Sequence, residues 1–515
     1  MTQDQNLYTA LRAAFPADLD GIAVETADGP LGQPFEPLAY TWGDLDRGSA
    51  MIANLLQSLE LPEGARIAVQ AEKSVEALML YLAVLRAGFV YLPLNTAYQA
   101  GEIEYFVGDA QPSVVVCGKR NHSWVSQLAF KAGVQHVFML DEDRTGNLLE
   151  RAVLQSDRQQ PAQRRAGDLA AILYTSGTTG RSKGAMLSHG NLLGNARVLQ
   201  EAWGWSPGDV LLHALPIFHV HGLFVAIHGA LLNGSPMVWF SRFDPAAVAA
   251  RLAEATVFMG VPTMYVRLLG HTALSEDGCR GMRLFVSGSA PLLPETFERW
   301  RERTGHAILE RYGMSETVML TSNPYDGERR AGTVGLPLPG VDVRVRLDSG
   351  AVAKPDEIGG IEVSGPSVFA GYWRMPERTR DDFTSDGWFR TGDVGRFDAD
   401  GYLTIVGRSK DLIISGGYNV YPAEVEAAIN QLPGVAESAV VGAPHPDFGE
   451  SVLALVVPRA GASIEPQGVI AALKERIANF KVPKEVIVVD ELPRNAMGKV
   501  QKNLLREKHG GSFSE

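Results

Sequence analysis

The sequence has little of several features, and each absence excludes a class of protein. Only two of its 515 residues are cysteines, Cys117 and Cys279, far apart in the chain, so we expect reduced thiols rather than a disulfide or metal framework. No apolar run approaches the length of a membrane span, since the candidate at residues 222–232 is interrupted by His228. The first residues are partly acidic and contain no apolar core of a signal peptide. These absences predict a cytoplasmic protein without a membrane span.

The chain also lacks an excess of basic residues. Its formal net charge is −12 at pH 7, which argues against binding of DNA or RNA because that requires a basic face. A local basic cleft for the phosphates of a small molecule remains compatible with this charge. The remaining composition, 45% hydrophobic and 21% charged, is that of a soluble globular protein, and the length predicts two or more packed units. Nothing in the sequence indicates the oligomeric state.

Most of the chain alternates short apolar runs with segments of helical periodicity. Runs without polar alternation are typical of strands buried on both faces, so we expect an α/β fold with mostly parallel sheets covered by helices. A helix is predicted over residues 75–85. The predicted strands are residues 66–70, 90–94, 114–117, 137–140, 169–174, 210–212, 237–240, 257–259 and 284–286.

The pattern changes near Val341. Residues 341–346 alternate cleanly, and the strand-like runs 359–363 and 402–406 lie between turns rich in Gly and Asp, which predicts an antiparallel sheet or a small β-barrel-like part. After a polar break at residues 407–413 the chain reads as a separate small α+β domain. That domain is predicted to contain a helix that starts at Tyr421-Pro422, strands at 438–442, 452–457 and 485–489, and a helix around 469–477.

The segment TSGTTGRSKG, residues 175–184, follows a buried strand and has the composition of a phosphate-binding loop. Glycines let backbone N–H groups turn toward an anion, hydroxyls add donors and a lysine adds charge. The loop lacks the Walker spacing, and a solvated turn is the alternative. It nevertheless predicts a nucleoside triphosphate as ligand. The predicted phosphate-binding residues are Thr175, Ser176, Gly177, Thr178, Thr179, Gly180 and Lys183.

Further motifs follow this loop in order. They are PIFHVHG at 216–222, SGSAPL at 287–292, RYGMSET at 311–317, GWFRTGD at 387–393, GRSKDLI at 407–413, GGYNVYPAEVE at 416–426 and PRNAMGK at 493–499. Together they resemble the adenylate-forming superfamily of AMP-binding enzymes, which includes acyl-CoA synthetases. The resemblance implies ATP, Mg²⁺ and coenzyme A as cofactors or co-substrates. It also implies a large domain over residues 1–408 and a small mobile domain over 409–515, with a hinge near Lys410.

The resemblance assigns catalytic roles to three residues. Glu316 in RYGMSET is implied as a magnesium ligand with help from Thr175, because Mg²⁺ prefers oxygen ligands; a capping or salt-bridged acid is the structural alternative. Lys499 is implied as the lysine that reaches the α-phosphate and the acyl carboxylate, and the alternative is a solvated lysine. His219 is implied to guard the channel to the acyl carbon, whereas we interpret His221 as a core histidine.

Nucleotide and coenzyme A contacts are implied by the same motifs. Tyr312 is expected to pack on adenine against a wall made by residues 288–290, and Asp393 with Arg408 to bind the ribose. The hairpin of GGYNVYPAEVE is expected to face coenzyme A, an assignment that depends on family analogy alone. The residues concerned are Gly288, Ser289, Ala290, Tyr312, Gly313, Met314, Ser315, Asp393, Arg408, Gly416, Gly417 and Tyr418.

The acyl group is predicted from Arg283, which opens the strand leading into the adenine wall. A guanidinium in an acyl pocket is costly to bury unless a second carboxylate pairs with it, so Arg283, with Ser287 and His219, predicts a dicarboxylate such as malonate. The alternative is an arginine that braces the strand through a structural salt bridge.

The segments 218–232, 283–292, 308–317, 321–330 and 368–377 resemble malonyl-CoA synthetases. Ser315 stands where threonine is frequent and residues 318–320 also depart from the pattern, so a substituted malonate stays open. The predicted function is formation of malonyl-CoA, AMP and pyrophosphate from malonate, ATP and coenzyme A. The alternatives are a ligase for a medium-chain or aromatic acid and a nucleotide-binding protein without catalysis.

Overall fold

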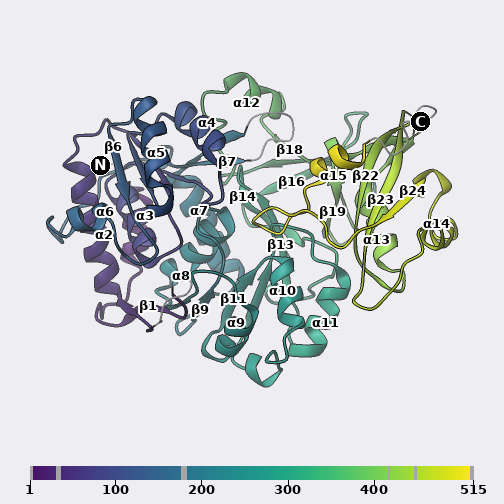
Figure 1. The fold of residues 1–515 in the computed structure, drawn as a ribbon, viewed down its shortest axis with the longest axis horizontal. Coiled ribbons are helices and arrows are strands. Elements are labelled where there is room, and N and C mark those ends of the chain that lie inside the picture. The colour runs from purple at the N-terminus through teal and green to yellow at the C-terminus, as the bar shows by residue number, and fades with distance from the viewer. Residues whose placement is uncertain (1–3, 30–35, 176–181, 416–417, 446–448, 511–515) are drawn as a thin grey trace. The chain divides into compact units, whose positions relative to one another are not determined.

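The computed structural model describes residues 4–29, 36–175, 182–415, 418–445 and 449–510. The chain divides into two compact units (Figure 1). The large unit contains Met1–Asp342 and Ser364–Gly387, and the small unit contains Val343–Val363 and Trp388–Glu515.

A six-stranded sheet in the large unit carries the phosphate-loop motif. Its order is β6-β5-β3-β4-β7-β8, and only the last pair, β7 with β8, is antiparallel. Strands without polar alternation are buried on both faces here, as predicted. The strands are β3 Arg66–Gln70, β4 Val90–Pro93, β5 Val114–Cys117, β6 His136–Met139, β7 Leu169–Thr175 and β8 Lys183–Ser188.

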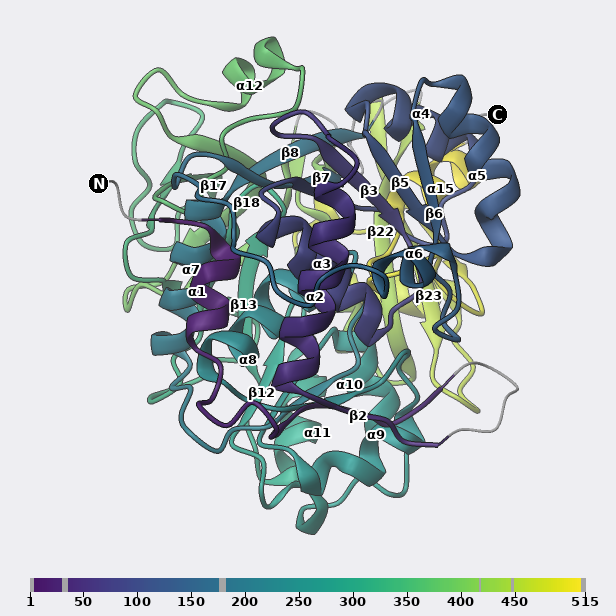
Figure 2. The same ribbon diagram turned by 90° about the vertical axis from the view of Figure 1, so that its left-hand side faces the viewer.

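Helix α3, Val75–Arg86, lies against α2, Trp42–Gln57, and is buried along its whole length (Figure 2). It begins at Ser74, whose side chain accepts a hydrogen bond from Ala77 N at 3.1 Å. Other helices of this region are α1 Leu7–Ala13, α4 Ala100–Ala110, α5 Lys119–Lys131, α6 Asn147–Ala152 and α7 His189–Ala202. The long apolar α3 thus anchors the sheet to the rest of the unit.

A nine-stranded sheet in the same unit places the later motifs side by side. Its order is β15-β14-β13-β12-β11-β9-β10-β1-β2. Strands β10, β9, β11, β12 and β13 are parallel to one another, so their carboxyl ends share one edge. The strands are β1 Ile22–Thr26, β2 Ala39–Thr41, β9 Leu211–His213, β10 Met237–Trp239, β11 Val257–Gly260, β12 Leu284–Ser287, β13 Leu309–Met314, β14 Val318–Ser322 and β15 Leu336–Pro337.

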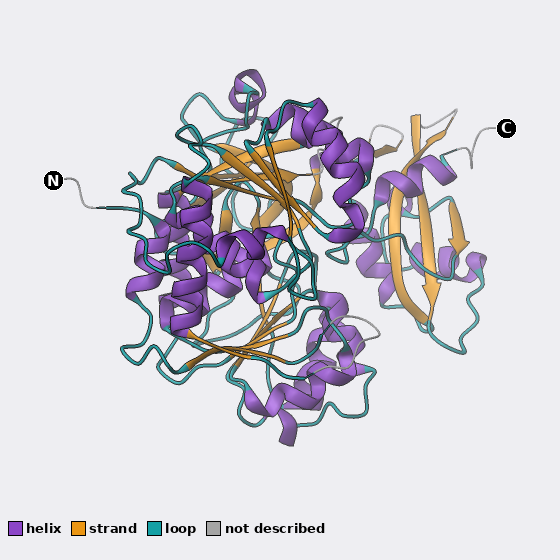
Figure 3. Cartoon of the chain, turned by 60° about the vertical axis from the view of Figure 1, so that its left-hand side comes forward, coloured by secondary structure: helices purple, strands orange, loops and turns teal. Residues whose placement is uncertain are grey.

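Helices cover the sheets of the large unit (Figure 3). The remaining helices of this unit are α8 His228–Asn233, α9 Pro245–Arg251, α10 Pro262–Leu269, α11 Pro294–Thr304 and α12 Pro376–Asp382, with a π-helix at His221–Ile227. The apolar run at 222–232 is therefore a buried helical segment. In the described part of the chain, no helix is both long and apolar enough to cross a bilayer.

The small unit contains two sheets. The first has four strands in the order β16-β17-β18-β19, which are Asp342–Arg346, Gly359–Ser364, Phe389–Phe397 and Leu403–Arg408. The second contains β20 Ile413–Ser415, β21 Tyr418–Val420, β22 Val435–His445, β23 Gly449–Pro458 and β24 Glu485–Val488, with helices α13 Pro422–Asn430, α14 Pro466–Lys474 and α15 Lys502–His509.

The predicted fold class is confirmed, with one correction. The large unit has mostly parallel sheets with helices, and the carboxyl-terminal part is α+β. The β-barrel-like part is an open four-stranded sheet, because in the described residues β16 and β19 are its two edges and do not pair with each other. The four-stranded sheet belongs to the small unit, and the boundary at residues 408 and 409, like the hinge near Lys410, stays a prediction.

Candidate functional site

The phosphate-loop motif lies on a β-hairpin. Thr175 ends β7 and pairs with Lys183, the first residue of β8, and Thr175 Oγ1 donates to Lys183 O at 3.5 Å. Five of the predicted phosphate-binding residues lie outside the described residues, so their contacts stay a prediction. They are Ser176, Gly177, Thr178, Thr179 and Gly180.

Lys183 lies between two groups that the sequence did not single out. Its Nζ is 3.4 Å from Asp382 Oδ2 at the end of α12, and it lies 4.2 Å from the centre of the Tyr372 ring. Asp382 also pairs with Arg378 at 2.9 Å. Both new residues come from the segment around VFAGYWRMPE, which contributed to the resemblance but whose side-chain partners no local pattern reveals.

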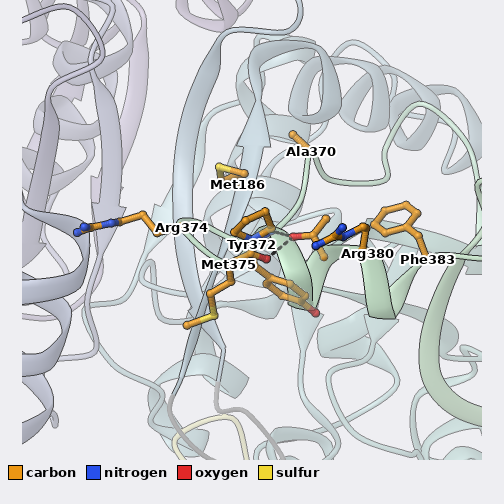
Figure 4. Close-up of a pocket in the computed structure, with 9 residues that line it drawn as sticks. Met186, Ala370, Tyr372, Arg374, Met375, Arg380 and Phe383 are labelled. Atoms are coloured by element: carbon orange, nitrogen blue, oxygen red, sulfur yellow. Dashed lines mark hydrogen bonds between the residues drawn. The ribbon is translucent and has the colours of Figure 1, made fainter.

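Glu316 is held inside the protein close to this lysine site. It is 5% exposed, and the Tyr372 hydroxyl donates to its Oε1 at 3.0 Å. Burial, followed by the charges of Glu316 and Asp382, raises the pKa of Tyr372 well above its ordinary value, so the phenol remains a hydrogen-bond donor. Tyr372 also forms part of the wall of a pocket of about 460 Å³ (Figure 4).

The hairpin that carries Glu316 is tightly constrained. Thr317 N donates to Met314 O at 3.2 Å, and Ser315 lies in the turn between β13 and β14. Val318 has φ 55°, a left-handed conformation that is strained for a β-branched residue. At Gly313 an added Cβ would lie 1.9 Å from Val318 O. Only glycine therefore fits at this point of the motif.

The predicted adenine wall and Tyr312 lie on adjacent strands. Ser287 ends β12 and pairs with Glu310 of β13, so Gly288 and Ser289 continue beside Arg311 and Tyr312, and Ala290 follows. Ser289 has φ 72°, and its Oγ lies 3.3 Å from His221 Nδ1. His219 is half-buried, and its Nδ1 accepts from His221 N at 3.3 Å. His221 is thus buried but faces this wall.

The prediction that Arg283 binds a substrate carboxylate is not supported. Its guanidinium already donates to both carboxylate oxygens of Asp209 at 2.6 Å and to Trp203 O at 2.9 Å. The ring centre of Tyr325 lies 5.2 Å away. Because Arg283 is already paired with the carboxylate of Asp209, it does not require a carboxylate from the substrate. These contacts favour the alternative interpretation, in which Arg283 braces the strand through a structural salt bridge.

Arg311, which sequence reasoning treated only as part of a motif, has the properties expected of Arg283. It is 3% exposed, and its Nε and Nη2 have no hydrogen-bond partner in the described part of the chain. Burial lowers its pKa below the ordinary value for arginine. An added Cβ at Gly288 would lie 2.5 Å from its Cζ, so the guanidinium lies directly against the end of β12.

Three further buried polar atoms near Arg311 have no hydrogen-bond partner among the described residues. They are Ser287 Oγ, His221 Nε2 and Glu310 Oε2. Buried polar groups are normally hydrogen-bonded, and each exception requires an explanation. Ser287 and Glu310 belong to β12 and β13 where these strands pair, close to the carboxyl edge at which open parallel sheets bind ligands.

The small unit brings three predicted residues together. Asp393 and Arg408 are paired across β18 and β19, with Arg408 Nε 3.0 Å from Asp393 Oδ1. Desolvation, followed by the charge of Arg408, lowers the pKa of Lys499 to about 8. Gly498 has φ 72°, and Asn495 N donates to Lys499 O at 3.0 Å, so a tight turn precedes the lysine.

The predicted coenzyme A face is described only in part. Gly416 and Gly417 lie outside the described residues. Tyr418 is exposed and its ring stacks on Phe480, with ring centres 4.8 Å apart. No group of three or more His, Cys, Asp and Glu side chains gathers as a metal site among the residues with described positions.

Family models match most of the chain. The AMP-binding enzyme family matches residues 27–373, and the AMP-binding enzyme C-terminal domain matches residues 424–499. The chain belongs to the family of AMP-binding enzymes, and the predicted resemblance is confirmed.

Individual relatives cover nearly all of the chain. A malonate–CoA ligase of Arabidopsis thaliana is 34% identical, covering 98% of this chain and 90% of that protein. A feruloyl-CoA synthase of Amycolatopsis sp is 35% identical, covering 92% and 94%. Among solved structures, ATP-bound MatB from Rhodopseudomonas palustris is 50% identical with a TM-score of 0.95, covering 99% of this chain and all (100%) of that chain.

Proposed function

We propose that this protein is an ATP-dependent acid–CoA ligase that converts malonate and coenzyme A into malonyl-CoA, with AMP and pyrophosphate as the other products. The family and the malonate–CoA ligase relatives support this reaction class. The observation that carries the choice of acid is Arg311, a buried guanidinium whose Nε and Nη2 have no hydrogen-bond partner in the described residues.

A dicarboxylate satisfies the polar groups at the end of β12. An unpaired buried charge is costly, whereas a carboxylate that accepts two N–H bonds from a guanidinium compensates that cost and gives specificity. Ser287 Oγ and His221 Nε2 add further hydrogen-bonding positions beside it. A small monocarboxylate reacting through its only carboxyl group would leave Arg311 unpaired. Malonate has a second carboxylate for Arg311 while the first one reacts.

The reaction begins with attack of a carboxylate oxygen on the α-phosphorus of ATP, which forms an acyl-AMP and releases pyrophosphate. Positive charge must hold the two anions together, and we assign this role to Lys499 and to Lys183 at the phosphate loop. Ribose contacts are assigned to Asp393 with Arg408, and His219 to the channel. Coenzyme A then attacks the acyl carbon, and AMP leaves with the electron pair of the broken bond.

The residues present fit a magnesium ion. Mg²⁺ usually takes one or two carboxylates together with phosphate oxygens and water rather than a cage of protein ligands, so the buried Glu316, with the hydroxyl of Thr175 from the phosphate-loop motif, is sufficient. When bound, the ion would neutralise phosphate charge. Glu316 would supply the carboxylate, already oriented by Tyr372. The cytoplasmic location remains part of this proposal.

An aromatic-acid ligase is the competing function, because the feruloyl-CoA synthase relative is as similar as the malonate–CoA ligase. The test is pyrophosphate exchange across malonate, methylmalonate, propionate, benzoate and ferulate, repeated for thioester formation with coenzyme A. Malonate or methylmalonate should give the highest kcat/KM in both assays. A preference for ferulate or benzoate would replace the proposed substrate, and absence of exchange with every acid would contradict the reaction class.

A further inference from the structure

Tyr372, in the segment that leads into α12, contacts both charged groups of the predicted nucleotide site in the large unit. Its hydroxyl donates to Glu316 Oε1 at 3.0 Å, and Lys183 Nζ lies 4.2 Å from the centre of its ring. The lysine belongs to the phosphate-loop hairpin, and the glutamate to the hairpin of β13 and β14, so one side chain joins two motifs far apart in sequence.

The ring of Tyr372 is itself held firmly. Its backbone N donates to Thr379 Oγ1 at 2.9 Å, and Phe369 packs edge-on against it with ring centres 4.8 Å apart. The residue is buried. The backbone bond holds the residue in place beside the pocket (Figure 4), and the packing of Phe369 limits the orientation of the ring.

Lys183 and Glu316 contact different parts of the same side chain, that of Tyr372. Lys183 pairs with Asp382 Oδ2 at 3.4 Å, and its ammonium also lies over the Tyr372 ring, which stabilises it by a cation–π interaction. The hydroxyl at the ring edge donates to the Glu316 carboxylate, a bond that is strengthened by the charge of its acceptor. Tyr372 therefore supports the ammonium with its ring and directs the carboxylate with its hydroxyl.

We propose that Tyr372 is a positioning residue that orients the Glu316 carboxylate through its hydroxyl and supports the ammonium of Lys183, which pairs with Asp382, with its ring. The proposal rests on the proposed function only in requiring a bound nucleotide with its divalent ion; it does not depend on the acid. It adds a residue to the reaction that acts through Glu316 and Lys183.

Two conservative variants give a matched test. Tyr372→Phe keeps the ring and loses the hydrogen bond to Glu316. Tyr40→Phe loses an equivalent bond, since Tyr40 OH donates to Glu76 Oε1 at 2.7 Å, in a part of the unit that we assign no role. The measurement is Mn²⁺ binding to the ligand-free protein and to its complex with a non-hydrolysable ATP analogue, alongside the melting temperature of the ligand-free protein.

Tyr372→Phe should weaken Mn²⁺ binding in the nucleotide complex by roughly tenfold, the usual scale for a hydrogen bond to a charged group, and Tyr40→Phe should leave it unchanged. Tyr372→Leu, which also removes the ring beside Lys183, should weaken binding of the ATP analogue more than Tyr372→Phe does. In a Glu316→Ala background, which has no acceptor for the hydroxyl, Tyr372→Phe should have no additional effect on analogue binding, because the two changes remove one interaction.

The outcomes separate the two proposals. If the wild type binds neither analogue nor Mn²⁺, the proposed function is wrong. If the wild type binds both and Tyr372→Phe binds them equally well, Tyr372 is not a positioning residue. Equal weakening by Tyr40→Phe, or a full additional loss in the Glu316→Ala background, would show a general structural effect and would also overturn the inference.

Discussion

Two arginines, one near each end of strand β12, differ in their hydrogen bonding. At the amino end, Arg283 donates twice to Asp209 and once to a backbone carbonyl, so every strong contact that it makes is within the protein. At the carboxyl end, Arg311 of the neighbouring strand lies against Gly288 and has unpartnered Nε and Nη2 atoms in the described residues. The hydrogen bonds of Arg283 are made within the protein, whereas two guanidinium nitrogens of Arg311 lack such bonds among the described residues. This difference indicates that a ligand binds at Arg311. In parallel sheets that place is the carboxyl edge.

Replacing Arg311 should give the largest effect on activity. If its guanidinium pairs with the second carboxylate of malonate, Arg311→Ala should lower kcat/KM for malonate by roughly 30-fold to several thousand-fold, the range for truncating one member of a buried charge pair. Propionate, which has no second carboxylate, should lose much less. Steady-state kinetics with both acids measure the ratio.

The melting temperature of Arg311→Ala serves as the control. Removal of a buried charge that lacks a partner should leave the ligand-free protein as stable as the wild type or more stable. A malonate-to-propionate ratio equal to that of the wild type would remove Arg311 from the acyl site.

Arg283→Ala should produce the opposite pattern. It leaves the Asp209 carboxylate, with a side chain 3% exposed, buried without its cation, which destabilises a protein by about 3 kcal/mol. Arg283 itself is 19% exposed, so the loss should lie at or below this figure. Chemical denaturation measures it. The malonate-to-propionate ratio should not change, and a selective loss of malonate use would restore Arg283 as a binding residue.

These two arginines also show how far the sequence alone could be interpreted. Strands β3 and β5 have the predicted bounds, because an apolar β-branched run identifies a buried strand locally. The contacts of Arg283 are not local: Asp209 lies 74 positions away, and only the pairing of β9, β11 and β12 brings it close. The position of Arg283 in the sequence therefore predicted a carboxylate partner from the substrate, whereas Asp209 of the protein itself is that partner.

The same limit applies to the site residues that were missed. Tyr372 is 56 positions from Glu316, and neither its spacing nor its neighbours in VFAGYWRMPE indicate that its hydroxyl donates to that carboxylate. Arg311 stands inside a predicted motif, but its burial and its missing partners follow from the register of β12 with β13. Motif order predicted which segments meet, whereas the polar pairing within the site required the fold.

Two glycines at the ends of β12 sharpen the comparison further. An added Cβ at Gly288 would lie 2.5 Å from Arg311 Cζ, whereas at Gly281, two residues before Arg283, the nearest atoms would be 3.8 Å away. Gly288→Ala should displace the guanidinium and raise the KM for malonate by roughly tenfold, since a small misplacement of a positioning group is costly. Gly281→Ala should change neither KM nor melting temperature. Equal effects of the two variants would mean that the end of β12 does not define the acyl site.

The smallest expected difference appears in acid. Burial alone would raise the pKa of Asp209, but the hydrogen bonds from Arg283, Ser206 and Thr256 outweigh it and hold the pKa below 3.8. A carboxylate with a depressed folded-state pKa contributes stability that is complete above the unfolded-state value and is lost as pH falls through the folded-state value. In Arg283→Ala the same carboxylate is buried and unpaired, so protonation in acid removes the free-energy cost of burying its charge.

The gap in unfolding free energy between wild type and Arg283→Ala should therefore narrow by about 1 kcal/mol between neutral pH and about pH 3, as one pKa unit corresponds to about 1.4 kcal/mol. Arg311 Nε and Nη2 have no hydrogen-bond partner in the described part of the chain, and burial raises the pKa of the neighbouring Glu310 to about 8. Glu310 therefore stays mostly protonated over this range, and the gap between wild type and Arg311→Ala should stay constant. Urea denaturation at several pH values measures both gaps, and a constant gap for Arg283→Ala would show that the Asp209 pair is not what stabilises the amino end of the strand.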